Sequence, residues 1–197
     1  MTRLNSDDPT QTTLPRRLLT VGHGTLGSDE LTSLLREAGV VSLVDIRTAP
    51  GSRRSPHLHR LELARWLPEE GVDYRWDPAL GGFRKPDPES PNFRLRNSSF
   101  RGYADYMDSP EFWEALDDVL VEAEERMLTV MCSESVWWRC HRRLVADAAE
   151  LARGFAVEHL MHDGRLLPHR LTDGVRLTDD DRVRYDGGEE QLLRPDV

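Results

Sequence analysis

The most reactive side chains of this chain follow one short apolar run, residues 128–131. Cys132 comes directly after the run, Glu134 follows it, and Cys140 and His141 stand where a helical pattern begins. A thiol at the end of a buried strand that faces a helix N-terminus is in a setting that lowers its pKa. We therefore identify Cys132 as a candidate nucleophile, with Glu134 and His141 as candidate acid–base groups.

Of the two thiols, we expect Cys132 to be the more reactive. The free amides and dipole of the helix that begins near His141, together with Arg142, favour an anion at the end of the strand. The direction of Cys140 depends on the geometry of the helix cap. A carboxylate nearby would raise a thiol pKa, so we expect Glu134 to point toward an arginine.

Two other uses of the same residues were considered. Two cysteines, a histidine and a glutamate form a candidate metal-ligand set, but Cys140 follows Cys132 by eight positions, which matches no common zinc knuckle. No residue is assigned as a metal ligand, and the cofactor is left unknown. A phosphatase loop has five residues between its cysteine and its arginine. It does not fit here, because six residues separate Cys132 from Arg139.

Polar groups also follow other apolar runs. His23 stands between two glycines after the first run and is an acid–base candidate. Asp45 and Arg47 follow the second run, where a structural ion pair is the alternative to ligand binding. Ser52 and Arg53 come next, and an arginine fork matches a phosphate or a carboxylate.

The elements that must gather these residues alternate along the chain. Runs rich in β-formers occur at 18–21, 40–46, 72–76, 128–131 and 157–161, and helical patterns between them at about 28–38, 60–70, 110–123 and 141–153. This alternation predicts a single-domain, three-layer α/β fold, Rossmann-like or flavodoxin-like, with a mainly parallel sheet of about five strands. Because ligands bind outside the carboxyl ends of parallel strands, we expect the reactive residues to meet there.

Composition limits the class of protein. A chain of 197 residues suits one domain, and no apolar run reaches the roughly 20 residues that a membrane helix needs. The N-terminus lacks a signal peptide and two cysteines make no disulfide scaffold, so we expect a cytoplasmic protein without membrane contact. The net charge of −9 argues against a nucleic-acid coat, although a nucleic-acid partner stays open.

Residues 1–17 are expected to form a disordered lead, residues 18–171 the α/β domain and residues 172–197 an acidic tail. The proline-rich segment 81–99 is long for a passive connection, and we expect it to be more mobile than the strands that it connects.

Five ordered blocks carry a resemblance to a known family. They are Thr20-Val21-Gly22-His23-Gly24; Val44-Asp45-Ile46-Arg47 with Pro50 and Ser52-Arg53; Tyr74 with Leu80-Gly81-Gly82; Gly102-Tyr103-Ala104 with Met107; and Met131-Cys132-Ser133-Glu134 with Cys140-His141-Arg142. Over about 18–162 the chain resembles the domain of unknown function 488 family. In the last block, Cys132, Glu134, Cys140, His141 and Arg142 fit the family's pattern. One departure is Gly24-Thr25, where the family usually has a serine after the histidine.

The resemblance brings no settled activity, so the reaction is left undetermined. We expect an enzyme that acts on a small anionic substrate, nucleotide-like or phosphate-bearing, at the carboxyl edge of the sheet. One alternative is a non-catalytic ligand sensor or nucleic-acid-associated binding protein, and another is a thiol redox protein that uses Cys132 and Cys140. The candidate substrate-binding residues are Asp45, Arg47, Ser52, Arg53, Tyr103 and Arg142.

Overall fold

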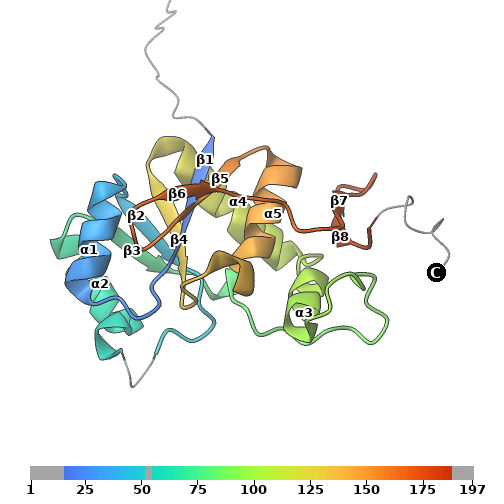
Figure 1. The fold of residues 1–197 in the computed structure, drawn as a ribbon, viewed down its shortest axis with the longest axis horizontal. Helices are drawn as coiled ribbons and strands as arrows, with labels where there is room; N and C mark the ends of the chain where they lie inside the picture. The colour runs from blue at the N-terminus through green and yellow to red at the C-terminus, as the bar shows by residue number, and fades with distance from the viewer. Residues whose placement is uncertain (1–15, 52–54, 188–197) are drawn as a thin grey trace, which may run out of the picture.

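A six-stranded sheet forms the centre of the molecule (Figure 1). The computed structural model describes residues 16–51 and 55–187. The sheet has the strand order β3-β2-β4-β1-β5-β6, in which the first five strands run parallel and β6 runs antiparallel. Its strands are β1 (Arg17–Gly22), β2 (Ser42–Asp45), β3 (Asp73–Trp76), β4 (Leu128–Cys132), β5 (Ala156–Leu160) and β6 (Leu166–Pro168). The predicted α/β fold with a mainly parallel sheet is confirmed.

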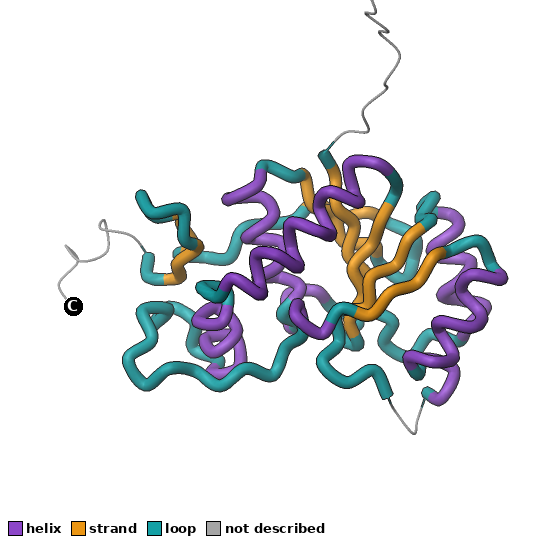
Figure 2. The backbone as a smooth tube through the Cα atoms, turned by 180° about the vertical axis from the view of Figure 1, so that it is seen from behind, coloured by secondary structure: helices purple, strands orange, loops and turns teal. Residues whose placement is uncertain are grey.

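Helices cover both faces of the sheet, as Figure 2 shows from behind. They are α1 (Ser28–Glu37), α2 (Arg60–Glu69), α3 (Ser98–Tyr106), α4 (Pro110–Glu125) and α5 (Arg142–Arg153). Leu19 and Val21 of β1 pack with buried residues of α1 and α2, whereas Leu18 packs with those of α4 and α5. Because successive side chains of a strand point to opposite faces and both faces are covered, β1, β2 and β4 are buried along nearly their whole length. None of the helices in the described ranges is long and apolar enough to cross a bilayer.

The helix boundaries follow local capping chemistry. Ser109 caps α4, since its hydroxyl accepts a hydrogen bond from the Phe112 amide at 3.3 Å. Gly154 ends α5 in the left-handed conformation with φ 67°. At α1, Ser28 is the first helical residue and Gly27 is the N-cap, whose amide donates to the Glu30 carboxylate at 2.7 Å.

The expected acidic tail contains folded structure as far as residue 187. Strands β7 (Val175–Leu177) and β8 (Val183–Tyr185) form an antiparallel hairpin that lies against α5. Tyr185 is fully buried, and its hydroxyl donates to Asp147 of α5 at 2.9 Å. Val183 and Tyr185 alternate with a polar residue and face the core. Their burial holds this segment in a strand although its composition is acidic.

The long connection from β3 to α3 is anchored at its middle. The Asp105 carboxylate accepts hydrogen bonds from the Asp87 amide at 2.8 Å and the Asn92 side chain at 2.9 Å. Asn92 is fully buried and accepts from the Tyr185 amide at 3.1 Å, which ties this connection to the C-terminal hairpin. That residues 81–99 move more than the strands stays a prediction for amide exchange.

A chain of buried polar side chains joins the sheet to the hairpin. His159 of β5 contacts the Thr20 hydroxyl at 2.7 Å and the His169 ring at 3.0 Å, and His169 contacts Asp147 at 2.9 Å. The ring of Trp137 stacks on His159 with a centroid separation of 4.1 Å. Every member has a partner, as buried polar groups require.

The burial of His159 predicts a loss of stability in acid. Burial, followed by the charges of His169 and Arg142, lowers the pKa of His159 from 6.5 to about 3. The unfolded chain therefore binds a proton below pH 6.5 that the folded protein does not bind until about pH 3, so stability falls as pH decreases through this window. We expect this group to remove about 2 kcal/mol between pH 7.5 and pH 5.

Urea unfolding of the wild type and of His159→Gln at the two pH values measures this contribution. The variant should be less stable at pH 7.5 but lose about 2 kcal/mol less on acidification. Equal losses in the two proteins would assign the acid sensitivity to other groups.

Candidate functional site

Strand β4 lies between β1 and β2, and its pairing brings their carboxyl ends to one edge. Cys132 is opposite Gly22 of β1, and Met131 is opposite Asp45 of β2. The ladder continues past the strand ends, where the His23 amide donates to the carbonyl of Cys132 at 3.0 Å. The segments that follow the three strands therefore meet, as expected for ligand sites in parallel sheets.

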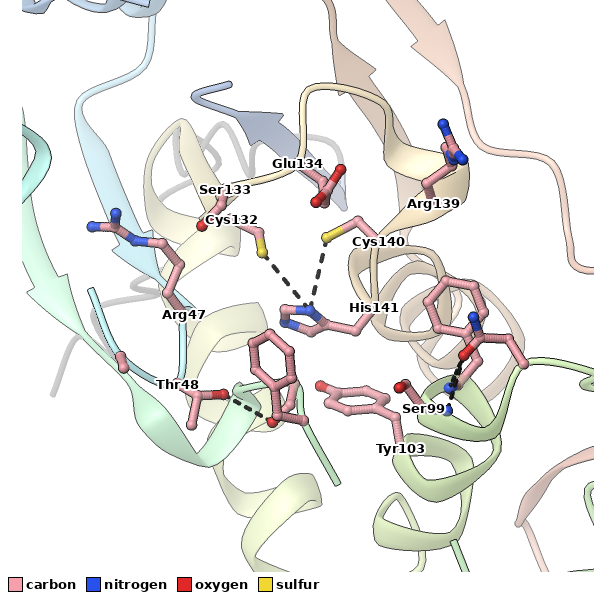
Figure 3. A pocket seen from close by; sticks show the side chains of 15 residues that line it. Arg47, Thr48, Ser99, Tyr103, Cys132, Ser133, Glu134, Arg139, Cys140 and His141 are labelled. Atoms are coloured by element: carbon pink, nitrogen blue, oxygen red, sulfur yellow. Dashed lines mark hydrogen bonds between the residues drawn. The ribbon is translucent and has the colours of Figure 1, made fainter. Parts of the chain in front are cut away.

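A pocket of about 310 Å³ opens at this edge (Figure 3). Its walls come from the segments after β2 and β4, the connection after β3, helix α3 and the start of α5. The helices after the neighbouring strands β2 and β4 lie on opposite faces of the sheet, an arrangement that leaves a crevice between strand ends. The lining residues are Arg47, Thr48, Ala49, Gly82, Phe83, Asn97, Ser99, Phe100, Tyr103, Cys132, Ser133, Glu134, Arg139, Cys140 and His141.

Both cysteines contact one histidine ring in this pocket. The Nδ1 atom of His141 lies 3.8 Å from the sulfur of Cys132 and 3.7 Å from that of Cys140 (Figure 3). The Nε2 atom of His141 lies 3.2 Å from the carbonyl oxygen of Ile46. A carbonyl can only accept, so Nε2 carries the proton and, in the neutral ring, the lone pair of Nδ1 faces the two sulfurs.

The order of the two thiol pKa values is opposite to the one expected. The hydrogen bond with Cys140 and burial raise the pKa of Cys132 well above its usual value. Burial raises the pKa of Cys140, but its hydrogen bond with Cys132, its contact with His141 and the positive charge of Arg142 bring it well below its usual value. These directions run against the expected activation of Cys132, whose greater reactivity stays a prediction for thiol labelling across pH.

Residues around His141 hold its ring in place. A β-carbon on Gly82 would lie 2.9 Å from Nδ1 of His141, so only glycine lets the connection after β3 approach this closely. The ring of Tyr103 lies 5.0 Å from the His141 ring, and its hydroxyl donates to the carbonyl of Leu80 at 2.8 Å. These contacts leave His141 with one orientation.

Arg142 lies beneath the loop that follows β4. It is 1% exposed, and its guanidinium donates to the carbonyl of Glu134 at 2.5 Å. Its Nε atom has no hydrogen-bond partner among the described residues. Arg142 does not line the pocket, so the expectation that it contacts the substrate is replaced by a role as a buried positive charge close to the two thiols.

Asp45, Arg47 and His23 form a hydrogen-bonded group beside the pocket, of which Arg47 alone lines it. Arg47 donates to Asp45 from Nε at 2.8 Å and from Nη2 at 2.6 Å, and to the carbonyl of Leu58 at 2.9 Å. Both ring nitrogens of His23 are hydrogen-bonded: Nδ1 to the Gly24 carbonyl and Nε2 to the Arg47 guanidinium. Burial and the charge of Arg47 lower the pKa of His23 from 6.5 to about 4, so this ring is neutral and internally bonded at neutral pH.

The remaining expected site residues divide into two sets. Glu134 and Tyr103 line the pocket, whereas Ser52 and Arg53 lie outside the described residues. Glu134 forms no ion pair within the described ranges, although an arginine partner was expected; its carbonyl, not its carboxylate, meets Arg142.

Sequence reasoning missed part of the pocket wall, chiefly Phe83, Asn97, Ser99, Phe100 and Arg139. Phe83 is 91% exposed and has φ 59°, a conformation that a bulky side chain adopts at a cost. A phenylalanine directly after two glycines, in the connection that follows β3, was the available signal in the sequence. Arg139 lies between Glu134 and Cys140 in the sequence. Nothing in the sequence separates it from the other arginines, and only the structure places it at the pocket rim.

The chain matches the family model described as "Domain of unknown function DUF488" over residues 28–149, more than half of its length, and it belongs to this family. The match includes the Asp45–Arg47 segment, Tyr103 and the cysteine block, while His23 precedes it. No curated protein and no solved structure matches the chain.

The departure at Gly24 has a local explanation. A β-carbon at this position would lie 2.1 Å from the hydroxyl oxygen of Ser135, and Gly24 has φ 52°. The hydroxyl of Ser135, from the loop after β4, therefore occupies the space that a side chain on residue 24 would need.

Gly22 is the tightest backbone contact of the site. A β-carbon here would lie 1.8 Å from the carbonyl oxygen of Glu134 and 2.6 Å from Nη2 of Arg142. Since a backbone atom cannot move aside as a flexible side chain does, we expect Gly22→Ala to lower the free energy of unfolding by about 3 kcal/mol.

Chemical denaturation with Gly27→Ala as the matched control tests this contact. A β-carbon on Gly27 meets only a Glu30 oxygen at 3.5 Å, so its cost should stay below about 1 kcal/mol. Similar stabilities of the two variants would show that the loop after β4 relaxes freely away from β1.

Proposed function

We propose that this protein is an enzyme that acts on a small anionic substrate in the pocket at the carboxyl edge of its sheet. The observation that carries the proposal is that Cys132, Cys140 and His141, which contact one another, form one wall of an otherwise accessible pocket. A volume of about 310 Å³ falls at the lower end of the range of small-molecule sites.

The reacting groups in this proposal are the cysteine–histidine cluster and Glu134. The lone pair of His141 Nδ1 faces both sulfurs and can accept a thiol proton, which is the arrangement that activates a cysteine nucleophile. Glu134 lies on the same pocket and is free of ion pairs within the described part of the chain, so its carboxylate is available as a second acid–base group.

Arg139 is the group best placed to bind the anion. Its side chain is exposed at the pocket rim and forms no ion pair with the residues that the structure describes. The donors of Arg47 are used by Asp45, His23 and Leu58, so Arg139 takes the part first assigned to Arg47. The buried charge of Arg142 adds to the positive field near the pocket.

The aromatic walls favour a substrate with a flat part. Phe83, Phe100 and Tyr103 line the pocket, and a planar group can stack on such rings. A nucleotide-like molecule combines a flat base with an anionic phosphate, which suits aromatic side chains beside an arginine.

The proximity of the two thiols keeps a redox function as a second candidate. The ligand atoms of Cys132, Cys140 and His141 all lie within 4.8 Å of one another, and a reducing cytoplasm would hold both cysteines as thiols. A dithiol needs both sulfurs to form a disulfide. Non-reducing mass spectrometry therefore separates this function from the first, because a thiol redox cycle would produce an intramolecular disulfide in the wild type.

Ligand stabilisation tests the anion site. In a thermal unfolding screen of nucleotides, sugar phosphates and small carboxylates, a ligand at 100 times its dissociation constant adds about 2.7 kcal/mol to stability. Arg139→Gln should weaken binding about 10-fold to 100-fold, because it removes one charge-assisted hydrogen bond. Arg36→Gln, on the exposed side of α1, is the matched control and should bind as the wild type does.

Turnover of the compounds that bind completes the test. The wild type should convert at least one of them, and Cys140→Ser and His141→Asn should not. Binding without conversion would make the protein a ligand sensor, and a screen without any stabilising compound would contradict the small-ligand proposal.

A further inference from the structure

We propose that Cys132, Cys140 and His141 hold a zinc-class divalent ion whose fourth coordination position opens into the pocket. The inference stands on the geometry of three side chains. It rests on the proposed function only for the use of the open position by a substrate, so the ion can be tested without any knowledge of the reaction.

The separations of the three ligand atoms fit a tetrahedral ion. Bonds of about 2.3 Å to sulfur and about 2.0 Å to nitrogen place a sulfur and a nitrogen about 3.5 Å apart and two sulfurs about 3.8 Å apart. The observed distances from His141 Nδ1 are 3.8 Å to Cys132 and 3.7 Å to Cys140. All three atoms lie within 4.8 Å of one another, so binding requires shifts of about 1 Å or less.

The histidine already has the protonation pattern that a ligand needs. A metal-bound imidazole usually donates its second ring N–H to a carbonyl or a carboxylate, which fixes the tautomer and the ring plane. His141 Nε2 lies 3.2 Å from the carbonyl of Ile46, and Gly82 and Tyr103 hold the ring from two sides. The lone pair is therefore directed at the point between the two sulfurs.

The surroundings leave one position open and favour negative ligands. Two cysteines and one histidine with a fourth, exchangeable position form the ligand pattern of catalytic rather than structural zinc sites. All three residues line the pocket, and Glu134 and Arg139 line the same pocket. Arg142, buried and without an acidic partner in the described ranges, supplies a fixed positive charge close to the thiolates.

The two cysteines of this site do not come from one tight turn, so the short spacing of a zinc knuckle is not required here. Zinc knuckles take two cysteines from one tight turn, so their spacing in the sequence is short. Here Cys132 ends strand β4, and Cys140 and His141 precede helix α5. The loop between them folds back, so the distance along the chain says little about the distance in space.

Metal binding to the full-length protein tests the site directly. Reduced, chelator-treated protein is titrated with Co²⁺ and followed by absorbance. We expect one equivalent to produce thiolate-to-cobalt charge-transfer bands and tetrahedral ligand-field bands, and Zn²⁺ to displace them. Cys132→Ser, Cys140→Ser and His141→Ala should each weaken Zn²⁺ binding by more than the 10-fold to 100-fold that is typical of outer-sphere changes.

His57→Gln, a histidine outside the cluster, is the matched control and should bind as the wild type does. Circular dichroism of each metal-free variant shows that it has folded. Absence of the charge-transfer bands, or bands that persist in both cysteine variants, would overturn the proposal. Metal binding by a protein that turns over no substrate supports the ion and counts only against the enzyme proposal.

Discussion

The pairing of β4 between β1 and β2 is the constraint on which the site depends. Parallel ladders set the register, so Cys132 comes opposite Gly22 and the segments after three strands emerge at one edge. A shift of one residue would turn every side chain of β4 to the other face of the sheet. Since both faces are covered by helices, such a shift would place Val130 and Met131 in the wrong cores, and the burial of these side chains holds the register.

Two glycines let backbone segments approach where side chains would prevent it. At Gly22 the carbonyl of Glu134 and the guanidinium of Arg142 occupy the space of a β-carbon, and at Gly82 the ring of His141 does. The first contact brings the loop after β4 down over β1. The second places the connection after β3 against His141. Together they hold segments that are far apart in the sequence in contact at the site.

Charge is distributed unevenly behind the pocket. The buried ion pair of Asp45 and Arg47 is closed on itself, with Tyr74 as a further donor at 2.8 Å and His23 as a neutral neighbour. Arg142 is buried without an acidic partner in the described part of the chain, a costly arrangement unless an anion lies near it. A thiolate at Cys132 or Cys140 would offset this cost, since the charge of Arg142 lowers the pKa of both thiols.

The sequence by itself determined the alternation of strands and helices, because apolar periodicity and capping are local properties. From this alternation followed the sheet edge at which the reactive residues gather, and the membership of Cys132 and His141 in one site. Only the tertiary structure decided that Arg47 bonds to Asp45 and that Arg139 stands at the rim, since the direction of a long side chain depends on partners distant in the sequence. It also decided that Val183 and Tyr185 are buried within an acidic segment, and that both thiols contact one histidine ring. Burial and contacts between distant segments depend on the assembled neighbours, which the sequence of a single segment does not contain.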